Sequence, residues 1–82
     1  MTKTMQMTWD AAVDVIKDCK TLNQIGWRVA RLLGISPRRV WENALDVEYG
    51  LRLLALLKQA IALRKRPKYV IFDRKGNVEA QW

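Results

Sequence analysis

The chain has 82 residues, half of them apolar, which suits one small domain with a single core and argues against wholesale disorder. It carries one cysteine and no histidine, so a disulfide framework and a Cys/His zinc site are excluded, and the sequence indicates no metal or cofactor. The net charge of +7 is typical of proteins that bind polyanions, although many small basic proteins bind none.

The positive excess falls in two segments of the chain. Residues 21–45 carry four arginines against one glutamate, and residues 59–68 carry four cations and no acid, while the other segments are balanced. Clustering of this kind is the electrostatic pattern expected of a nucleic-acid-binding protein. Cations near the end of a helix also suit the helix dipole, so the second cluster has a structural explanation as well.

The first predicted helix covers residues 8–20. Thr8 is suited to be its N-cap, and we expect the residues before it to be frayed. The apolar side chains at helical spacing are those of Trp9, Ala12, Val13, Ile16 and Cys19. The N-terminal segment lacks the apolar stretch of a signal peptide, and a lone cysteine suits a reducing compartment, so we expect a cytoplasmic protein.

The second predicted helix covers residues 21–33 and begins almost without a linker, because Thr21 and Gln24 form a capping box. Its inner stripe is expected to contain Leu22, Ile25, Val29 and Leu32 or Leu33. Gly26 lies inside this helix at a cost in helix propensity. Close packing against a neighbouring side chain would explain that glycine.

The third predicted helix covers residues 36–46 and follows a tight turn. Gly34 stops the preceding helix, because a residue without Cβ takes the left-handed conformation of a C-terminal cap. Ile35 can then turn inward between the two helices. Ser36 can cap the next helix, and Pro37 at its first position loses no hydrogen bond.

This helix, turn and helix resemble the helix-turn-helix superfamily of small bacterial and phage DNA-binding regulators. The matching residues are Ala30, Gly34, Ile35 and Val40. Many members have an apolar residue where this chain has Asn43, and Ala44 could take the buried role after a slight rotation of the helix. The resemblance implies double-stranded DNA as the partner and a second helix that enters its major groove.

A fourth helix is predicted over residues 50–65, because Gly50 favours a break near Tyr49 over one continuous helix to Arg64. Both arrangements remain open at this point. The segment Leu51–Leu63 is apolar around nearly its whole circumference, which predicts burial on several sides or a homodimer interface. It is shorter than the ~20 apolar residues that a bilayer requires, so we expect no membrane partner.

A β-hairpin is predicted over residues 69–82, with Arg74, Lys75 and Gly76 as its connection. Pairing Asp73 with Asn77 gives the hairpin one apolar face, made of Val70, Phe72, Val78, Ala80 and Trp82. Two strands alone are marginally stable, so the hairpin must pack on the helices or pair with the edge of a second copy. The elements together predict one mainly α domain over residues 1–82: a compact four-helix helix-turn-helix domain with a C-terminal two-stranded β-hairpin.

The resemblance implies which residues contact DNA. On the third helix and its cap these are Ser36, Arg38, Arg39, Trp41, Glu42 and Asn43, with Arg28 and Arg31 of the preceding helix as phosphate contacts. From their charge, and not from the resemblance, we expect Arg64, Lys65, Arg66 and Lys68 to be auxiliary phosphate contacts. Arg74 and Lys75 either touch the backbone as a wing does or are solvated turn residues.

Each of these side chains also has a structural interpretation. Arg38 is the first choice for guanine readout, and Glu42 either accepts from cytosine or pairs with Arg38 or Arg39 on the surface, which is the simpler expectation. Trp41 is expected to cover the margin of the core rather than to contact a base. Asn43 can bond adenine or a phosphate, or merely cap its helix.

No catalytic pattern is present, so we expect no enzyme. The sequence lacks histidine and a glycine-rich phosphate loop, and Asp10, Asp14 and Asp18 are interpreted as one solvated helix face. The function expected is that of a small, sequence-specific, dimeric DNA-binding regulator, with the homodimer formed through the Leu51–Leu63 helix, the hairpin or both. A protein-interaction module on the same scaffold is the alternative, and RNA binding with Trp41 or Tyr69 stacked on a base is a third.

Overall fold

The structure, a computed structural model, describes residues 4–82. Its elements, in chain order, are β1 (Thr4–Thr8), α1 (Trp9–Asp18), α2 (Leu22–Leu32), α3 (Pro37–Glu42), α4 (Leu45–Leu63), β2 (Tyr69–Asp73) and β3 (Val78–Gln81). The described chain is therefore mostly helical, with four helices and a C-terminal pair of antiparallel strands, as predicted. Its helix boundaries differ from the prediction mainly between residues 42 and 50.

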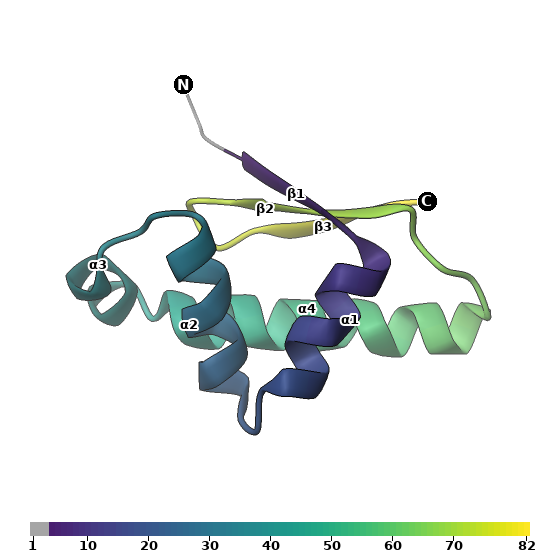
Figure 1. Cartoon of the computed structure of the whole chain (residues 1–82), viewed down its shortest axis with the longest axis horizontal. Coiled ribbons are helices and arrows are strands. Elements are labelled where there is room, and N and C mark those ends of the chain that lie inside the picture. The colour runs from purple at the N-terminus through teal and green to yellow at the C-terminus, as the bar shows by residue number, and fades with distance from the viewer. Residues whose placement is uncertain (1–3) are drawn as a thin grey trace.

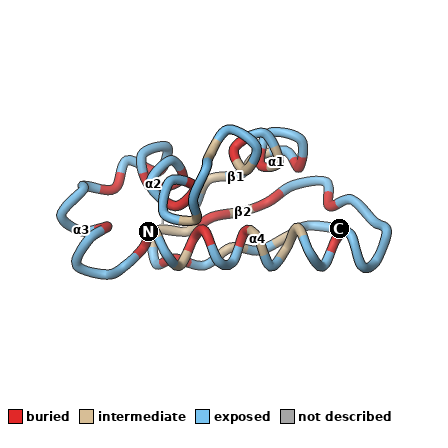
Figure 2. The backbone as a smooth tube through the Cα atoms, turned by 90° about the horizontal axis from the view of Figure 1, so that it is seen from below, coloured by how far each residue is buried: buried red, intermediate tan, exposed pale blue. Residues whose placement is uncertain are grey.

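Two helical layers enclose the core. In Figure 1, α1 and α2 run in opposite directions in front of α4, and the strands lie along one side of the helices. Seen from below in Figure 2, α1 and α2 lie on one side and α4 on the other, and buried stretches of backbone face the space between them. The molecule measures 37 × 31 × 16 Å, and α4 runs along most of the long axis.

The segment before α1 forms a third strand, so the expectation of a frayed N-terminus is wrong for residues 4–7. Residues 1–3 lie outside the described chain. β1 pairs antiparallel with β2, and the sheet order is β1-β2-β3. Met5 lies opposite Phe72 and Met7 opposite Val70, and both methionines are half-buried. The alternation of apolar and polar residues over these five positions is typical of a strand. It is too short to be recognised without the partner strand β2.

The predicted register of the hairpin is confirmed. Phe72 pairs with Val78 and Val70 with Ala80, which places the fully buried Val70 and Phe72 toward the helices. Trp82, expected on the same apolar face, is 47% exposed. The hairpin is stabilised as predicted by packing on the helices and, beyond that prediction, by the pairing of β2 with β1.

Two glycines bring the backbones of α2 and α4 into direct contact. A Cβ built at Gly26 would lie 1.8 Å from the carbonyl oxygen of Asp46, and one at Gly50 would lie 2.4 Å from that of Leu22. Gly26 is thus explained by close packing, although against a backbone and not the neighbouring side chain that was expected. Gly50 does not break the helix, because its lack of a side chain serves this crossing.

The break between α3 and α4 lies at Asn43 and Ala44, so residues 37–64 form two helices. Ala44 has a left-handed backbone with φ of 50° and separates the two helix axes. It is exposed, so it does not take the buried role that the resemblance assigned to it. The next residue, Leu45, is buried and is 4% exposed.

The leucine-rich helix α4 is only partly covered. Leu53 and Tyr49 are fully buried, whereas Leu51, Ile61 and Leu63 are each more than half exposed. Leu54, Leu56 and Leu57 are half-buried against the core. Across residues 4–82, no helix has both the length and the apolar character that crossing a membrane requires.

Candidate nucleic-acid interface

The turn between α2 and α3 is built from local hydrogen bonds. Gly34 has φ of 71°, its N–H donates to the carbonyl of Arg31, and the N–H of Ile35 donates to that of Ala30. This pair of bonds is a Schellman motif, which satisfies the last carbonyls of α2. The Ser36 hydroxyl accepts from the N–H of Arg39 at 3.4 Å, so the predicted stop and cap are both confirmed.

Three apolar side chains fix α3 to the rest of the domain. Ala30, Ile35 and Val40 are all buried, with exposed fractions of 1%, 6% and 0%. The remaining positions of α3 face outward, and the helix projects at one end of the long axis (Figure 1). Its outer side chains are therefore accessible to a large partner.

Arg38 and Glu42 of α3, and Asn43 at its C-cap, already have partners within the chain. The Nε of Arg38 lies 2.8 Å from Oε1 of Glu42, so the expected surface pair is confirmed. The Nδ2 of Asn43 donates to the carbonyl of Arg39 at 3.1 Å, which is the capping role. An exposed ion pair of this kind is worth less than about 1 kcal/mol, so a competing anion can displace Glu42 from Arg38.

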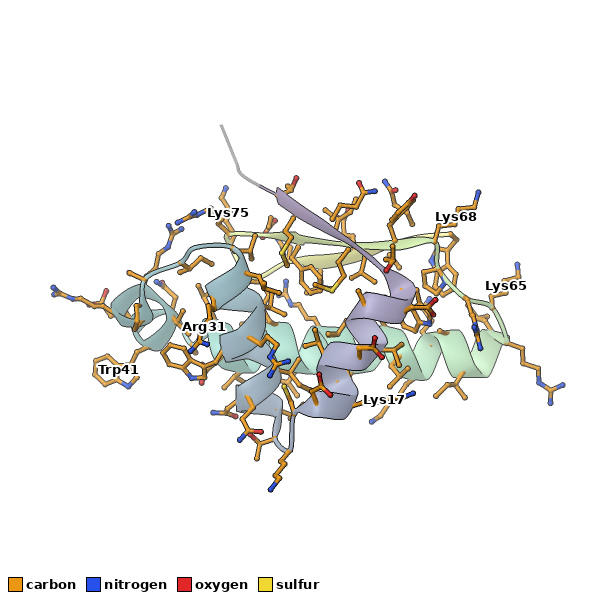
Figure 3. The ribbon with its side chains drawn as sticks, in the orientation of Figure 1. Lys17, Arg31, Trp41, Lys65, Lys68 and Lys75 are labelled. Carbon is orange, nitrogen blue, oxygen red and sulfur yellow. The ribbon has the colours of Figure 1, made fainter. Side chains whose placement is uncertain are left out.

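Trp41 lies on the surface, and the expectation that it covers the margin of the core is wrong. It is 79% exposed and points away from the body of the domain (Figure 3). The physical reason is the early end of α3 at Glu42. The left-handed Ala44 turns α4 away, so no element within residues 4–82 covers this side of α3.

The tip of the hairpin reaches the same end of the molecule. The Nη1 of Arg74 donates to the carbonyl of Leu33 at 3.2 Å, which ties the β2–β3 connection to the end of α2. Lys75 follows at the tip and lies near α3 in Figure 3. The sequence offered a wing or a solvated turn for these two residues, and their position beside α3 is compatible with a wing.

A shallow cationic pocket of about 370 Å³ forms where α3, α4 and the hairpin tip meet. Its lining residues are Arg39, Asn43, Leu45, Glu48, Arg52, Arg74 and Lys75. Arg52 is held in place, with Nη1 bonded to the carbonyl of Gly76 and Nε 3.2 Å from the carboxylate of Glu48. Sequence reasoning missed Arg52, because nothing along the chain indicates that α4 meets the hairpin tip there.

A buried tyrosine holds the tip from behind. The Tyr49 hydroxyl donates to the backbone carbonyl of Asp73, and its ring makes an edge contact with that of Phe72. Burial raises the pKa of Tyr49 above its ordinary value, and the nearby Asp73 carboxylate raises it further. The phenol therefore stays protonated and keeps donating.

The carboxylate of Asp73 organises the tip itself. It accepts from the N–H of Lys75 at 2.8 Å, the N–H of Asn77 at 2.9 Å and the Asn77 amide at 2.8 Å. Burial by itself would raise the pKa of Asp73. The hydrogen bonds from Asn77 and Lys75 outweigh burial and hold that pKa below its ordinary value.

The other predicted contact residues lie elsewhere. Arg28 is 3.5 Å from Asp18 of α1, and Arg31 lies on the outer face of α2 (Figure 3). Lys65 and Lys68 are at the opposite end of the long axis from Trp41 and Lys75 (Figure 3), and Arg64 and Arg66 belong to the same segment. The structure thus separates the cations of residues 64–68 from those of α3 and the hairpin tip, and Arg28 and Arg31 line a third surface together with Asp18 and Lys20.

Comparisons with known proteins place this chain in no group. No family model, no curated protein and no solved structure matches it. Within the described part of the chain, no three histidine, cysteine, aspartate or glutamate side chains lie close enough to hold a metal ion. Interpretation of the site therefore depends on its own geometry and charge.

Proposed function

We propose that this protein is a small, sequence-specific DNA-binding protein of the helix-turn-helix type, a cytoplasmic transcriptional regulator of the bacterial or phage kind. The observation that carries the proposal is the cationic pocket below α3, where four basic side chains from three elements surround one acid. In this proposal α3 approaches a groove of the duplex and the hairpin tip contacts the backbone beside it.

The residues divide into two roles. Arg39, Arg74 and Lys75 contact phosphates, because they surround the pocket and carry the charge that attracts a polyanion. Arg38 reads a base edge after Glu42 is displaced, since a guanidinium pairs with the O6 and N7 acceptors of guanine. Arg52 and Arg74 are already held by carbonyls, so less side-chain entropy is lost when an anion binds.

A homodimer is part of the proposal. Leu51 and Leu63 on α4 are exposed, and β3 pairs only with β2 in the described sheet, so both the helix and the strand edge are open to a second copy. Two copies would match the two-fold symmetry of a palindromic site.

Fluorescence anisotropy with random duplex DNA, titrated over a range of salt concentrations, tests the proposal. The variant Arg39→Ala/Lys75→Ala should bind more weakly and reduce the slope of log K against log salt by about two, because each phosphate contact contributes roughly 0.9. The control Lys20→Ala/Lys58→Ala removes two exposed cations that lie outside the lining of the pocket below α3, and it should leave the slope nearly unchanged. A folded wild type that fails to bind at low salt would overturn the proposal.

The exposure of Trp41 favours a protein-interaction module as the second candidate. Leu32, which is 55% exposed on α2, adds apolar surface outside the core. If DNA is the partner, Trp41→Ala should weaken binding less than Arg38→Ala/Arg39→Ala does. If a protein is the partner, Trp41→Ala should weaken binding to that protein more than Arg38→Ala/Arg39→Ala does. Replacing the duplex by single-stranded RNA in the same titration tests RNA binding, the third candidate.

A further inference from the structure

A groove of about 540 Å³ runs between α1 and the last turns of α4. In Figure 1, α1 crosses in front of α4, and the C-terminal turns of α4 extend beyond it. The apolar lining consists of Trp9, Val13, Leu57, Ala60 and Ile61. Ile61 is 68% exposed and adds apolar surface that a partner in the groove can cover.

The two walls of this groove carry opposite charges. Asp10 and Asp14 line it from α1, one helical turn apart, together with Lys17, so the α1 wall keeps a net charge of −1 (two acids and one base). Arg64, Lys65 and Arg66 line it from the end of α4. Arg64 has a left-handed backbone with φ of 55°, and the N–H of Lys65 donates to the carbonyl of Ala60. This cap turns the chain back after α4, so the cations border the groove.

The charged side chains of the two walls form no ion pair with one another within residues 4–82 of one copy. The ion pairs found among residues 4–82 are Arg28–Asp18, Arg38–Glu42 and Arg52–Glu48, and none of them spans the groove. The groove therefore offers an acidic wall, a basic wall and an apolar floor, each open to a partner.

We propose that a second copy of this chain docks in this groove about a two-fold axis. In such an interface each copy contributes the same surface, so α1 of one copy faces the end of α4 of the other. Asp10 and Asp14 of each copy then meet the partner's cationic segment, residues 64–66. Ile61 of each copy inserts into the apolar floor of the other groove.

Other occupants fit the charges less well. A polyanion would be attracted by the basic wall but repelled by Asp10 and Asp14, which line the same groove. A basic segment would meet the opposite problem at residues 64–66. A partner fits both walls when it places basic groups against α1 and acidic groups against the end of α4. A second copy related by a two-fold axis has this arrangement of charges by symmetry.

The proposal rests on the two-copy part of the proposed function and moves the interface from Leu51, Leu63 and the edge of β3 to the groove between α1 and α4. It assigns Arg64, Lys65 and Arg66 to the dimer, whereas the sequence suggested auxiliary phosphate contacts. Dimerisation is measurable without DNA, and DNA binding through α3 is measurable in a monomer. The two proposals can therefore fail separately.

Charge reversal with sedimentation equilibrium tests the proposal. Two variants reverse one wall each: Asp10→Lys/Asp14→Lys and Arg64→Glu/Lys65→Glu/Arg66→Glu. We expect the wild type to be a dimer and each variant alone to dissociate at least tenfold more readily, because like charges then face each other across the two-fold axis. An equimolar mixture of the two variants should regain the dimer, since the walls of one copy are then basic and those of the other acidic.

Two further variants keep the test decisive. Lys20→Glu/Lys58→Glu reverses exposed charges outside the groove and should leave the dimer unchanged, and Ile61→Glu should weaken it without altering the charge walls. Circular dichroism confirms that each variant is folded. A wild type that stays monomeric, or a dimer that persists unchanged in both charge-reversed variants, overturns the proposal.

Discussion

The crossing of α2 and α4 and the short helix α3 are held in opposite ways. At the crossing, backbone lies on backbone at Gly26 and Gly50, without intervening side chains. α3 spans six residues, buries Val40, and is otherwise fixed by caps at its two ends. One region has no room for any added atom, and the other leaves most of its side chains to solvent.

This difference shows which positions of the domain tolerate substitution. A substitution at the crossing forces two helices apart and affects the whole core, whereas one on the outer face of α3 meets mostly water. Stability is therefore concentrated in the crossing, and α3 is free to carry the side chains that select a partner.

Gly26→Ala, at the crossing of α2 and α4, should have the largest effect on the free energy of unfolding. Alanine gains up to about 1 kcal/mol in helix propensity, but its Cβ would meet the Asp46 carbonyl oxygen at 1.8 Å. We expect the free energy of unfolding to fall by ~3 kcal/mol, measured by urea denaturation. Gly34→Ala is the matched control: its φ of 71° strains alanine, yet nothing lies within 4 Å, so a loss of about 1–2 kcal/mol is expected. Equal losses in both variants would contradict this comparison.

Asp73→Ala should loosen the tip that connects the two regions. Loss of three hydrogen bonds to the carboxylate should lower the free energy of unfolding by about 1–3 kcal/mol at neutral pH. The folded-state pKa of Asp73 lies below its ordinary value of 3.8, so this stability is present above about pH 4. It is lost as the pH falls through the folded-state pKa.

Urea titrations from pH 7 to pH 2 check this dependence. The difference between wild type and Asp73→Ala should be constant near neutrality and shrink below pH 4. Glu79→Ala, an exposed carboxylate on β3, should show a much smaller difference at every pH. A gap between wild type and Asp73→Ala that does not shrink in acid would show that the carboxylate charge is not what holds the tip.

Ala44→Gly, at the link between α3 and α4, should have the smallest effect of the three changes on the free energy of unfolding. Alanine is strained at φ of 50°, and glycine relieves that strain while losing more entropy on folding. We expect the free energy of unfolding, measured by thermal denaturation, to rise by about 0.5–1 kcal/mol. Ala62→Gly, in the regular helix α4, should instead lose about 1 kcal/mol. A loss at Ala44 would mean that the link between α3 and α4 depends on stiffness more than on the left-handed turn.

The features that the sequence predicted are local ones. The turn at Gly34, the caps at Thr8, Thr21 and Ser36, and the Phe72–Val78 register depend on residues within a few positions of each other. The Arg38–Glu42 pair is likewise set by helical spacing. Each of these could be reasoned from backbone conformation and hydrogen bonding alone.

The features that it did not predict join distant segments. β1 depends on β2, Gly26 on Asp46, and the pocket on the meeting of Arg52 with the hairpin tip. Trp41 was misplaced because its exposure follows from the direction in which α4 departs at Ala44. Such relations arise only when the chain is folded, and no periodicity along the sequence records them.

The pairing of β1 with β2 also affects the order in which the helices and the sheet form during folding. During synthesis, β1 is made before the four helices and stays without its partner strand until all four of them have been made. Contacts between segments so far apart in the chain close slowly, because the loop entropy is lost before the contact is gained. The helices can therefore assemble early, and closure of the sheet is expected to be the late step in folding.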